Sequence, residues 1–414
     1  MERIVKIILT LINTAVLAAA GLIVYFNVTL PDTFYVSSGD ITSLPGPVSV
    51  TDGGGFITVM SRSSRGTETV IPSRMHLRLF GIIPIKDVTV EAVGTPELIP
   101  LGNPFGIKML TDGVMVVDTN SFETPVGFSS PAQNAGIRPG DVIKTIDGEA
   151  VFTNSDVASI IGNSGDIIEV KILRGGNEYS VLLSPELSIS DGMYKAGMWV
   201  KDSSAGIGTM TFYDKTTGIA AGLGHPVTDS QTGELMPLYS GEAVRVSIDR
   251  ILRGKTGFPG ELTGTFMTSD EIGTLVGNTE SGVYTRLQTA QDDEKALPLG
   301  FKQDIKTGEA TILSTINGET PKSYKILIES INLRGDETNS RDMVIKVVDE
   351  ELLRQTGGIV QGMSGSPIIQ DGKLIGAVTH VFVNNPTKGY AIFADTMYAE
   401  QKAYQNNFSI GEAA

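Results

Sequence analysis

The stretch 357–367 reads G-G-I-V-Q-G-M-S-G-S-P, and it contains the residue with the clearest chemical potential, Ser364. An apolar run before the serine and an apolar pair after the proline predict a sharp turn between two buried strands. Gly362 and Gly365 carry no Cβ to crowd a substrate and permit a strained turn. The same spacing lets the N–H groups of Gly362 and Ser364 point at one spot, where an oxyanion would form. We therefore predict that Ser364 is a nucleophile; the alternative is an ordinary Gly/Ser hairpin.

A serine nucleophile needs a base that titrates near neutrality and can return the proton. The chain has only three histidines, His76, His225 and His380. His225 follows a glycine turn, G-L-G-H-P, at the end of an apolar strand, and this context favours it as the base. His380 lies inside an apolar strand, where a buried structural histidine is expected, but its closeness to Ser364 in the sequence keeps it as the alternative. His76 stands in an apolar alternation that is typical of a strand.

The third member of such a constellation is a carboxylate that holds the tautomer of the imidazole. From the residues alone, Asp229, Asp249, Asp342 and Asp349 all remain open. Asp349 ends a strongly apolar strand, directly before a short helical stretch, and this predicts a partly buried carboxylate near the serine strand. The alternative role of Asp349 is that of a helix cap.

Composition restricts the classes of function. The chain has 414 residues, enough for two or three domains, and its hydrophobic content of 41% is that of a globular protein. The formal net charge of −15 argues against nucleic acid and anionic membrane surfaces as main partners. The absence of cysteine excludes disulfides, thiolate metal sites and a cysteine nucleophile. We expect no metal ion and no cofactor.

The N-terminus predicts a membrane anchor over residues 1–29. Residues 7–28 carry no charge, and at about 1.5 Å per residue they span the roughly 30 Å hydrocarbon core of a bilayer. Basic residues before this run and none close after it predict that the body of the chain is exported. The small residues 18–21 resemble a signal-cleavage site, but apolar residues continue beyond them, which favours an uncleaved signal-anchor. Residues 30–96 are predicted as a tether with short strands.

Residues 97–186 carry a recognisable pattern, P-A-Q-N-A-G-I from residue 131, then R-P-G-D-V-I and I-D-G. This combination resembles a PDZ domain, an α+β module that captures extended peptides as an added strand at an open sheet edge. The resemblance places the carboxylate-binding loop on Phe105, Gly106 and Ile107 and the second helix on 154–162, capped by Asn154 or Ser155. The alternative is that the module only packs against its neighbour.

Residues 187–414 contain about a dozen short strands between turn clusters, which predicts two packed β-barrels or a sandwich. Within them, G-M-S-G-S-P is similar to the G-D-S-G-G-P signature of trypsin-like serine peptidases, and the order His, Asp, Ser matches theirs. Met363 replaces the aspartate that pairs with a freed N-terminus in trypsin zymogens, so that mode of activation is not expected.

A closer resemblance covers most of the chain. A signal-anchor, a PDZ domain, G-H-P, V-V-D, G-M-S-G-S-P and T-H-V-F-V-N-N-P-T-K-G-Y together resemble the stage IV sporulation protein B peptidases of endospore-forming bacteria. In that family the triad positions correspond to His225, Asp349 and Ser364. The resemblance implies a mainly β protein, with the N-terminal helix, the PDZ domain at 97–186 and a trypsin-like peptidase of two β-barrels at 187–414.

The resemblance also implies a biological role. Such a signalling protease is exported from the forespore into the space between the two spore membranes. There it cleaves itself and the regulatory subunit of a membrane metalloprotease complex, so that a mother-cell sigma factor is processed. We predict self-cleavage in the tether at 31–54. The alternative from another class is a non-catalytic exported scaffold whose PDZ domain binds peptide tails.

Overall fold

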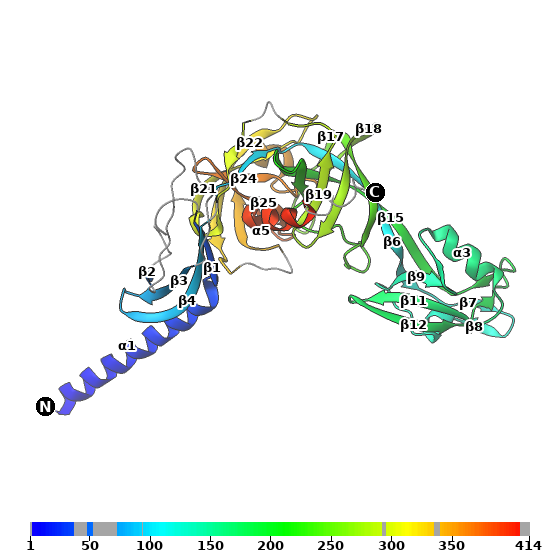
Figure 1. Cartoon of the computed structure of the whole chain (residues 1–414), viewed down its shortest axis with the longest axis horizontal. Coiled ribbons are helices and arrows are strands. Elements are labelled where there is room, and N and C mark those ends of the chain that lie inside the picture. Colours follow the sequence, from blue (N-terminus) through cyan, green and yellow to red (C-terminus); the bar gives the residue numbers. More distant parts are fainter. Residues whose placement is uncertain are drawn as a thin grey trace.

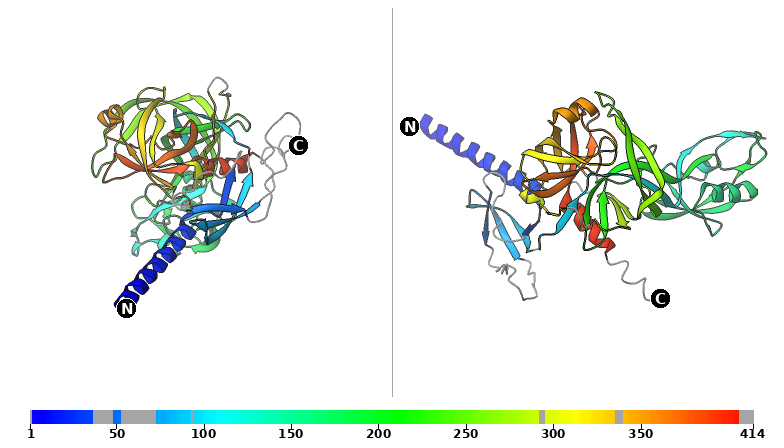
Figure 2. Two further views of the ribbon diagram at one scale, coloured as in Figure 1. Left: turned by 90° about the vertical axis from the view of Figure 1, so that its left-hand side faces the viewer. Right: turned by 90° about the horizontal axis from the view of Figure 1, so that it is seen from above.

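The structure is a computed structural model that describes residues 2–36, 48–52, 73–92, 94–291, 295–334 and 340–405. Figure 1 shows a long N-terminal helix with a small sheet at one end of the molecule, β-barrels in the centre and a smaller α+β body at the other end. The right-hand view in Figure 2, seen from above, shows the same succession. The chain is mainly β, as predicted.

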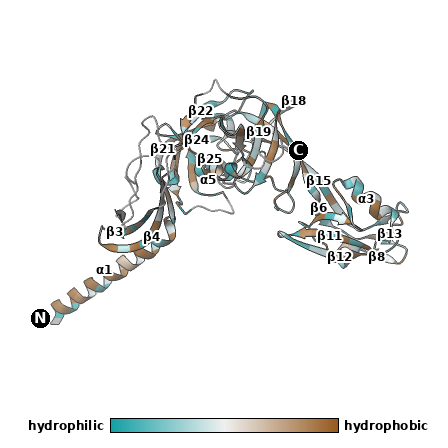
Figure 3. Ribbon diagram, in the orientation of Figure 1, coloured by the Kyte–Doolittle hydropathy of each residue, from teal (hydrophilic) through white to brown (hydrophobic). Residues whose placement is uncertain are grey.

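The N-terminal helix, α1 (Glu2–Thr29), is long and apolar enough to cross a membrane. Figure 3 shows apolar residues along its length. Its last turn packs on a sheet, with Phe26 and Leu30 buried against Leu77 and Leu79. Residues 37–47 and 53–72, which include most of the predicted self-cleavage tether, lie outside the described residues. The strands of this sheet are, in spatial order, β1 (Thr33–Val36), β4 (Ile83–Ala92), β3 (Ser73–Leu79) and β2 (Val48–Asp52).

The first barrel closes because two long strands, β6 (Pro104–Thr119) and β15 (Met198–Asp214), pair with each other as well as with their other neighbours. Its interior is filled by apolar side chains that alternate with outward-facing residues, among them Phe105, Ile107 and Met109. A short outer strand, β5 (Glu97–Pro100), extends this sheet and pairs with β20 (Leu297–Pro298). Around the barrel run β6 (Pro104–Thr119), β17 (Leu238–Leu252), β18 (Glu261–Thr279), β19 (Gly282–Leu287), β16 (Ile219–Gly222) and β15 (Met198–Asp214).

The second barrel is also closed, and its core is rich in isoleucine, including Ile312, Ile326 and Ile345. These two barrels confirm the prediction of a two-barrel peptidase fold. The helix α5 (Ala394–Gln401) packs against β16 of the first barrel and against β25 and β26 of the second. The second barrel consists of β21 (Gly308–Ser314), β22 (Lys322–Ile331), β23 (Met343–Val347), β26 (Lys388–Phe393), β25 (Lys373–Val381) and β24 (Pro367–Gln370), with α4 (Glu350–Thr356) after β23.

A two-stranded ribbon connects the α+β body to the first barrel. The C-terminal half of β6 and the N-terminal half of β15 leave the barrel together, in a register that runs from Thr209↔Pro104 to Met198↔Thr119. In the predicted PDZ segment, 97–186, the strand β5 and the N-terminal half of β6 therefore belong to the sheet of the first barrel, and β6 continues into the α+β body. Its remaining elements include α2 (Pro131–Asn134), β9 (Val142–Ile146), α3 (Asn154–Asn163), β11 (Ile168–Arg174) and β12 (Asn177–Leu183).

The helix α3 matches the predicted second PDZ helix closely. Its N-cap is Thr153, one residue before the predicted cap, and Thr153 and Asp156 form a reciprocal capping box. The minor strands of this body are β7 (Phe122–Thr124), β8 (Gly127–Ser129), β10 (Glu149–Ala150), β13 (Glu186–Leu187) and β14 (Tyr194–Lys195).

Candidate active site

Ser364 lies in the turn that enters β24, as the glycine pattern predicted. Gly362 and Gly365 flank it with φ angles of 97° and 96°, in the region that favours glycine. A Cβ on Gly365 would stand 1.9 Å from the Thr209 carbonyl oxygen, so only glycine fits there. The sequence thus bends sharply at Ser364 and brings the turn against β15 of the other barrel.

Two threonines of β15 hold this turn in place. The Thr209 N–H donates to the Ser364 carbonyl (2.9 Å), and the Thr209 hydroxyl donates to the Gly362 carbonyl (2.8 Å). The Thr211 hydroxyl donates to the Gly365 carbonyl (2.8 Å). Sequence reasoning missed both threonines, because they stand in an ordinary strand alternation that carries no catalytic signature.

The backbone around Ser364 leaves two N–H groups free. The Met363 N–H donates to Val360 and the Ser366 N–H donates to Met363. In the part of the chain that the structure describes, the N–H groups of Gly362 and Ser364 have no acceptor. An oxyanion hole requires unpaired donors of this kind beside the nucleophile.

The Ser364 hydroxyl is partly buried and donates to the Thr379 carbonyl at 2.6 Å. This carbonyl belongs to β25, next to His380. The hydroxyl proton therefore points at the backbone, and it must turn away from this carbonyl before it can be transferred to an imidazole.

His225 follows the end of β16, in a turn where Leu223 and Gly224 both have positive φ angles. A Cβ on Gly224 would lie 3.0 Å from atoms of Thr379 and Ile392, so this turn packs directly on the second barrel. His225 Nδ1 lies 2.8 Å from the Pro226 carbonyl oxygen. A carbonyl can only accept, so this contact puts the ring proton on Nδ1 and leaves Nε2 as a base.

The surroundings keep the His225 imidazole neutral. Burial lowers the pKa of His225 from its ordinary value of 6.5, and the bond to the Pro226 carbonyl opposes this only in part. A neutral ring with a free Nε2 lone pair is the form that a general base needs.

His380, the alternative base, lies beside His225. The ring centroids of His225 and His380 are 4.8 Å apart. Burial, the neighbouring His225 and the charge of Arg341 lower the pKa of His380 to about 4. Its Nδ1 is buried without a hydrogen-bond partner among the described residues. The fold therefore gathers His225, His380 and the Ser364 turn where the two barrels meet.

Asp349 directly precedes α4 and is the N-cap of that helix. One carboxylate oxygen accepts the Leu352 N–H (3.0 Å) and the other accepts the Lys325 N–H (3.2 Å). His225 makes no bond to this carboxylate in the described structure, since its Nδ1 contacts Pro226 instead.

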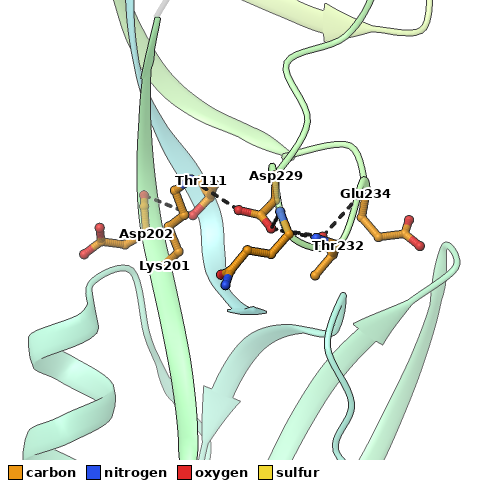
Figure 4. A network of polar contacts seen from close by, with 7 residues as sticks. Thr111, Lys201, Asp202, Asp229, Thr232 and Glu234 are labelled. Atoms are coloured by element: carbon orange, nitrogen blue, oxygen red, sulfur yellow. Dashed lines mark hydrogen bonds and ion pairs between the residues drawn. The ribbon is translucent and has the colours of Figure 1, made fainter. Parts of the chain in front are cut away.

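The other three acids also have partners elsewhere. Asp342 accepts the Phe393 N–H (2.9 Å) and Asp249 accepts the Thr265 hydroxyl (2.6 Å). Asp229 is buried, and Figure 4 shows it at the junction between the first barrel and the PDZ-like body. Within the described residues, the atom that holds the His225 tautomer is the backbone oxygen of Pro226.

The network in Figure 4 connects the loop after His225 to β15. Lys201 Nζ lies 3.2 Å from the Asp229 carboxylate, which also accepts the N–H and hydroxyl of Thr232. Burial by itself would raise the pKa of Asp229, but the hydrogen bonds from Thr232, Gln231 and Lys201 outweigh it and lower the pKa. The loop that begins at the histidine is thus anchored on the strand that carries the PDZ-like body.

The predicted carboxylate-binding loop needs a correction. Phe105, Gly106 and Ile107 lie inside β6, in the part that forms the first barrel, and Phe105 and Ile107 are buried. Both edges of β6 are occupied there, by β15 and by β17, and a Cβ on Gly106 would clash with Phe266. A peptide terminus therefore has no access to these residues, because long-range pairing uses the backbone groups that the loop would offer.

Comparison with known families agrees with this geometry. Residues 192–398, half of the chain, match the family model described as SpoIVB peptidase S55. Residues 105–184 match the model of the PDZ domain. The first match includes both histidines and the serine turn, and the second covers the α+β body.

Curated relatives share only short stretches with the chain. A protein of Mesorhizobium japonicum whose name assigns it to the zinc metalloproteases is 44% identical over 63 residues, 15% of this chain. The mitochondrial serine protease HTRA2 of Drosophila sechellia is 32% identical over 77 residues, 19% of this chain. The chain spans 17% of the length of each of these relatives.

Solved structures are similar at low TM-scores. The PDZ domain of an SdrC-like protein from Listeria monocytogenes has a TM-score of 0.18 and 22% identity, over 22% of this chain and 87% of that one. The HtrA-type protease AlgW with decapeptide has a TM-score of 0.29 and 14% identity, over 49% of this chain and 54% of that one. Because these TM-scores are low, the relationship of this chain to known proteins rests on the two family models.

Proposed function

The chain belongs to the SpoIVB peptidase S55 family, and on that premise we propose that it is an exported serine endopeptidase tethered to a membrane by α1. The observation that carries this proposal is the meeting of three groups at the contact between the barrels. They are the Ser364 turn with its two free N–H groups, the neutral His225 imidazole and the Thr209 clamp across the two barrels.

In the proposed reaction, the Ser364 hydroxyl turns from the Thr379 carbonyl toward His225. Nε2 of His225 takes the proton while Oγ attacks the scissile carbonyl carbon, and the same nitrogen later protonates the leaving amine. The N–H groups of Gly362 and Ser364 stabilise the negative charge that develops on the carbonyl oxygen. Water then hydrolyses the acyl-enzyme by the reverse sequence of proton transfers.

Asp349 is our proposal for the carboxylate of the triad, on the strength of the family match. Its two oxygens cap α4 and accept the Lys325 N–H, while Pro226 occupies Nδ1 of His225. A bond between Asp349 and Nδ1 of His225 therefore requires Nδ1 to leave the Pro226 carbonyl. Until such a change occurs, the Pro226 carbonyl keeps the imidazole in the required tautomer.

For its biological role, we propose that the chain cleaves itself in the segment after α1 and cleaves the regulatory subunit of a membrane metalloprotease complex. The cleavage would trigger sigma-factor processing during sporulation, from the space between the two membranes of the forespore. Family membership, the apolar helix and the PDZ domain support this proposal. The PDZ domain would recruit extended protein segments to the peptidase.

The test compares the full chain with its Ser364→Ala variant after reconstitution in vesicles. We expect trimming of the wild-type chain and labelling by a serine-directed fluorophosphonate, and neither in the variant. Ser366→Ala is the matched control. It removes another hydroxyl from the same turn, one that donates to the Ser314 hydroxyl of β21, and leaves Ser364 in place. If all three chains are trimmed alike, or if Ser364→Ala is still labelled, the proposal fails.

A further inference from the structure

The hairpin that joins β3 to β4 exposes apolar side chains at its tip. Phe80 is 63% exposed and Ile82 is 76% exposed, with Gly81 between them. The sequence is L-F-G-I-I-P-I from residue 79, without a polar side chain. Phe80 has a φ angle of 53°, which is costly for a bulky residue. In water, a ring that is 63% exposed buries little apolar surface to offset this strained backbone.

The hairpin runs alongside α1 and points back toward the N-terminal end of that helix. Asn27 Nδ2 donates to the Ile85 carbonyl (3.2 Å), and Lys86 Nζ donates to the Leu30 carbonyl. Higher residue numbers in α1 therefore correspond to higher residue numbers in β4. Because the tip precedes β4, it lies beside earlier residues of the helix; Figure 1 shows the sheet next to the end of α1.

The height of the tip along α1 follows from the rise of each element. Ile82 stands three residues before Ile85, which is roughly 10 Å along a strand. The same length corresponds to about six or seven residues of helix, counted back from Asn27, and so to the level of about Ala20 and Gly21. The charge-free run of α1 ends at Val28, so the tip reaches about 10 Å below that end.

We propose that Phe80 and Ile82 insert into the outer leaflet of the membrane beside α1, as a second point of attachment. The inference rests on the proposed anchoring role of α1. The depth is comparable with the 5–10 Å or so to which interfacial apolar groups enter the boundary between headgroups and acyl chains. The occupant is the acyl region of a bilayer, because the tip is apolar, lies beside an exposed apolar helix and sits level with its lipid-spanning part.

Lys86, the first charged residue of β4 after the tip, fits this placement. Lys86 lies at the end of α1, where its ammonium group donates to the carbonyls of Asn27 and Leu30 and pairs with Asp32. These charges are at the level where the apolar run ends, so the headgroup region would meet them. Two attachment points hold the sheet in one orientation on the bilayer, whereas α1 alone would allow it to rotate.

Fluorescence of a single tryptophan tests the proposal in the full chain. Trp199 is the only tryptophan in the sequence and is 63% exposed, so Trp199→Phe provides a silent background. Phe80→Trp in that background reports on the tip. Phe128→Trp is the matched control, because Phe128 is a 76% exposed phenylalanine on the β7–β8 hairpin of the PDZ domain, away from α1. Both proteins are reconstituted in phosphatidylcholine vesicles.

We expect lipids brominated on their acyl chains to quench most of the fluorescence of the Phe80→Trp chain, with an emission shifted to the blue. The Phe128→Trp chain should be quenched by acrylamide in water and not by the brominated lipids. If vesicle flotation succeeds but brominated lipids quench neither chain, the tip lies in water or on a protein surface. The tip proposal is then overturned, while the anchoring role of α1 stands. If the chains do not float with vesicles, the anchor fails, and the tip proposal with it.

Discussion

Replacing Thr209 with valine tests whether the clamp across the two barrels shapes the oxyanion hole. Valine has nearly the volume of threonine, and Thr209 is only 1% exposed, so the packing is kept while the bond to the Gly362 carbonyl (2.8 Å) is lost. The Thr209 N–H continues to hold the Ser364 carbonyl. A polar group that loses its partner in a buried site costs about 1–3 kcal/mol.

If this whole cost falls on the geometry that the N–H of Gly362 needs, the reaction slows by roughly five- to 150-fold, since about 1.4 kcal/mol corresponds to a factor of ten. The assay is the rate of covalent labelling of Ser364 by a fluorophosphonate, whose phosphoryl oxygen occupies the oxyanion hole. No natural substrate is required. Thr209→Ser keeps the hydroxyl and should restore most of the rate.

Thr211→Val is the matched control for stability. Its hydroxyl is equally buried and bonds the Gly365 carbonyl at 2.8 Å, on the other side of the serine. We expect a similar loss of unfolding free energy in both valine variants but a much smaller loss of labelling rate in Thr211→Val. Equal slowing of both variants, or an unchanged rate in Thr209→Val, would refute the reasoning.

Three more predictions concern the imidazole, the junction and the helix cap. Burial lowers the pKa of His225 below 6.5, so the base stays neutral to lower pH. The labelling rate should therefore fall on acidification with a midpoint below pH 6.5, and a midpoint at or above pH 6.5 contradicts this. Lys201→Met leaves the buried Asp229 carboxylate without its cation and should lower the unfolding free energy by about 1–3 kcal/mol in urea titrations, whereas Lys201→Arg should not. Asp349→Asn keeps a good N-cap and Asp349→Ala loses about 0.5–2 kcal/mol, so activity retained in the asparagine variant would count against a triad role.

Local sequence patterns were sufficient for several elements of this protein. The glycines around Ser364 predicted its sharp turn, and the glycine turn before His225 predicted an imidazole at the end of a strand. The charge-free N-terminus predicted α1, and the spacing of strands predicted two barrels or a sandwich, of which the structure has the two barrels. These features depend on neighbouring residues, because backbone dihedrals, helix periodicity and strand alternation are set within a few positions.

Other features depend on contacts between segments far apart in the chain. Phe105, Gly106 and Ile107 have the sequence of a peptide-binding loop, yet β15 and β17, about 100 or more positions later, pair with both of their edges. The carboxylate of Asp349 could equally cap a helix or hold an imidazole, and the structure shows it at the start of α4.

The Thr209 clamp shows why local patterns could not reveal the whole site. The two residues that it joins are 153 positions apart, and nothing near Thr209 distinguishes it from other strand threonines. Likewise, the closeness of His380 to His225 comes from the packing of one barrel on the other. The sequence by itself determined the local elements and the reactive groups that they carry. Only the tertiary structure decided which of those groups meet, because strand register and barrel packing depend on the summed burial of distant segments.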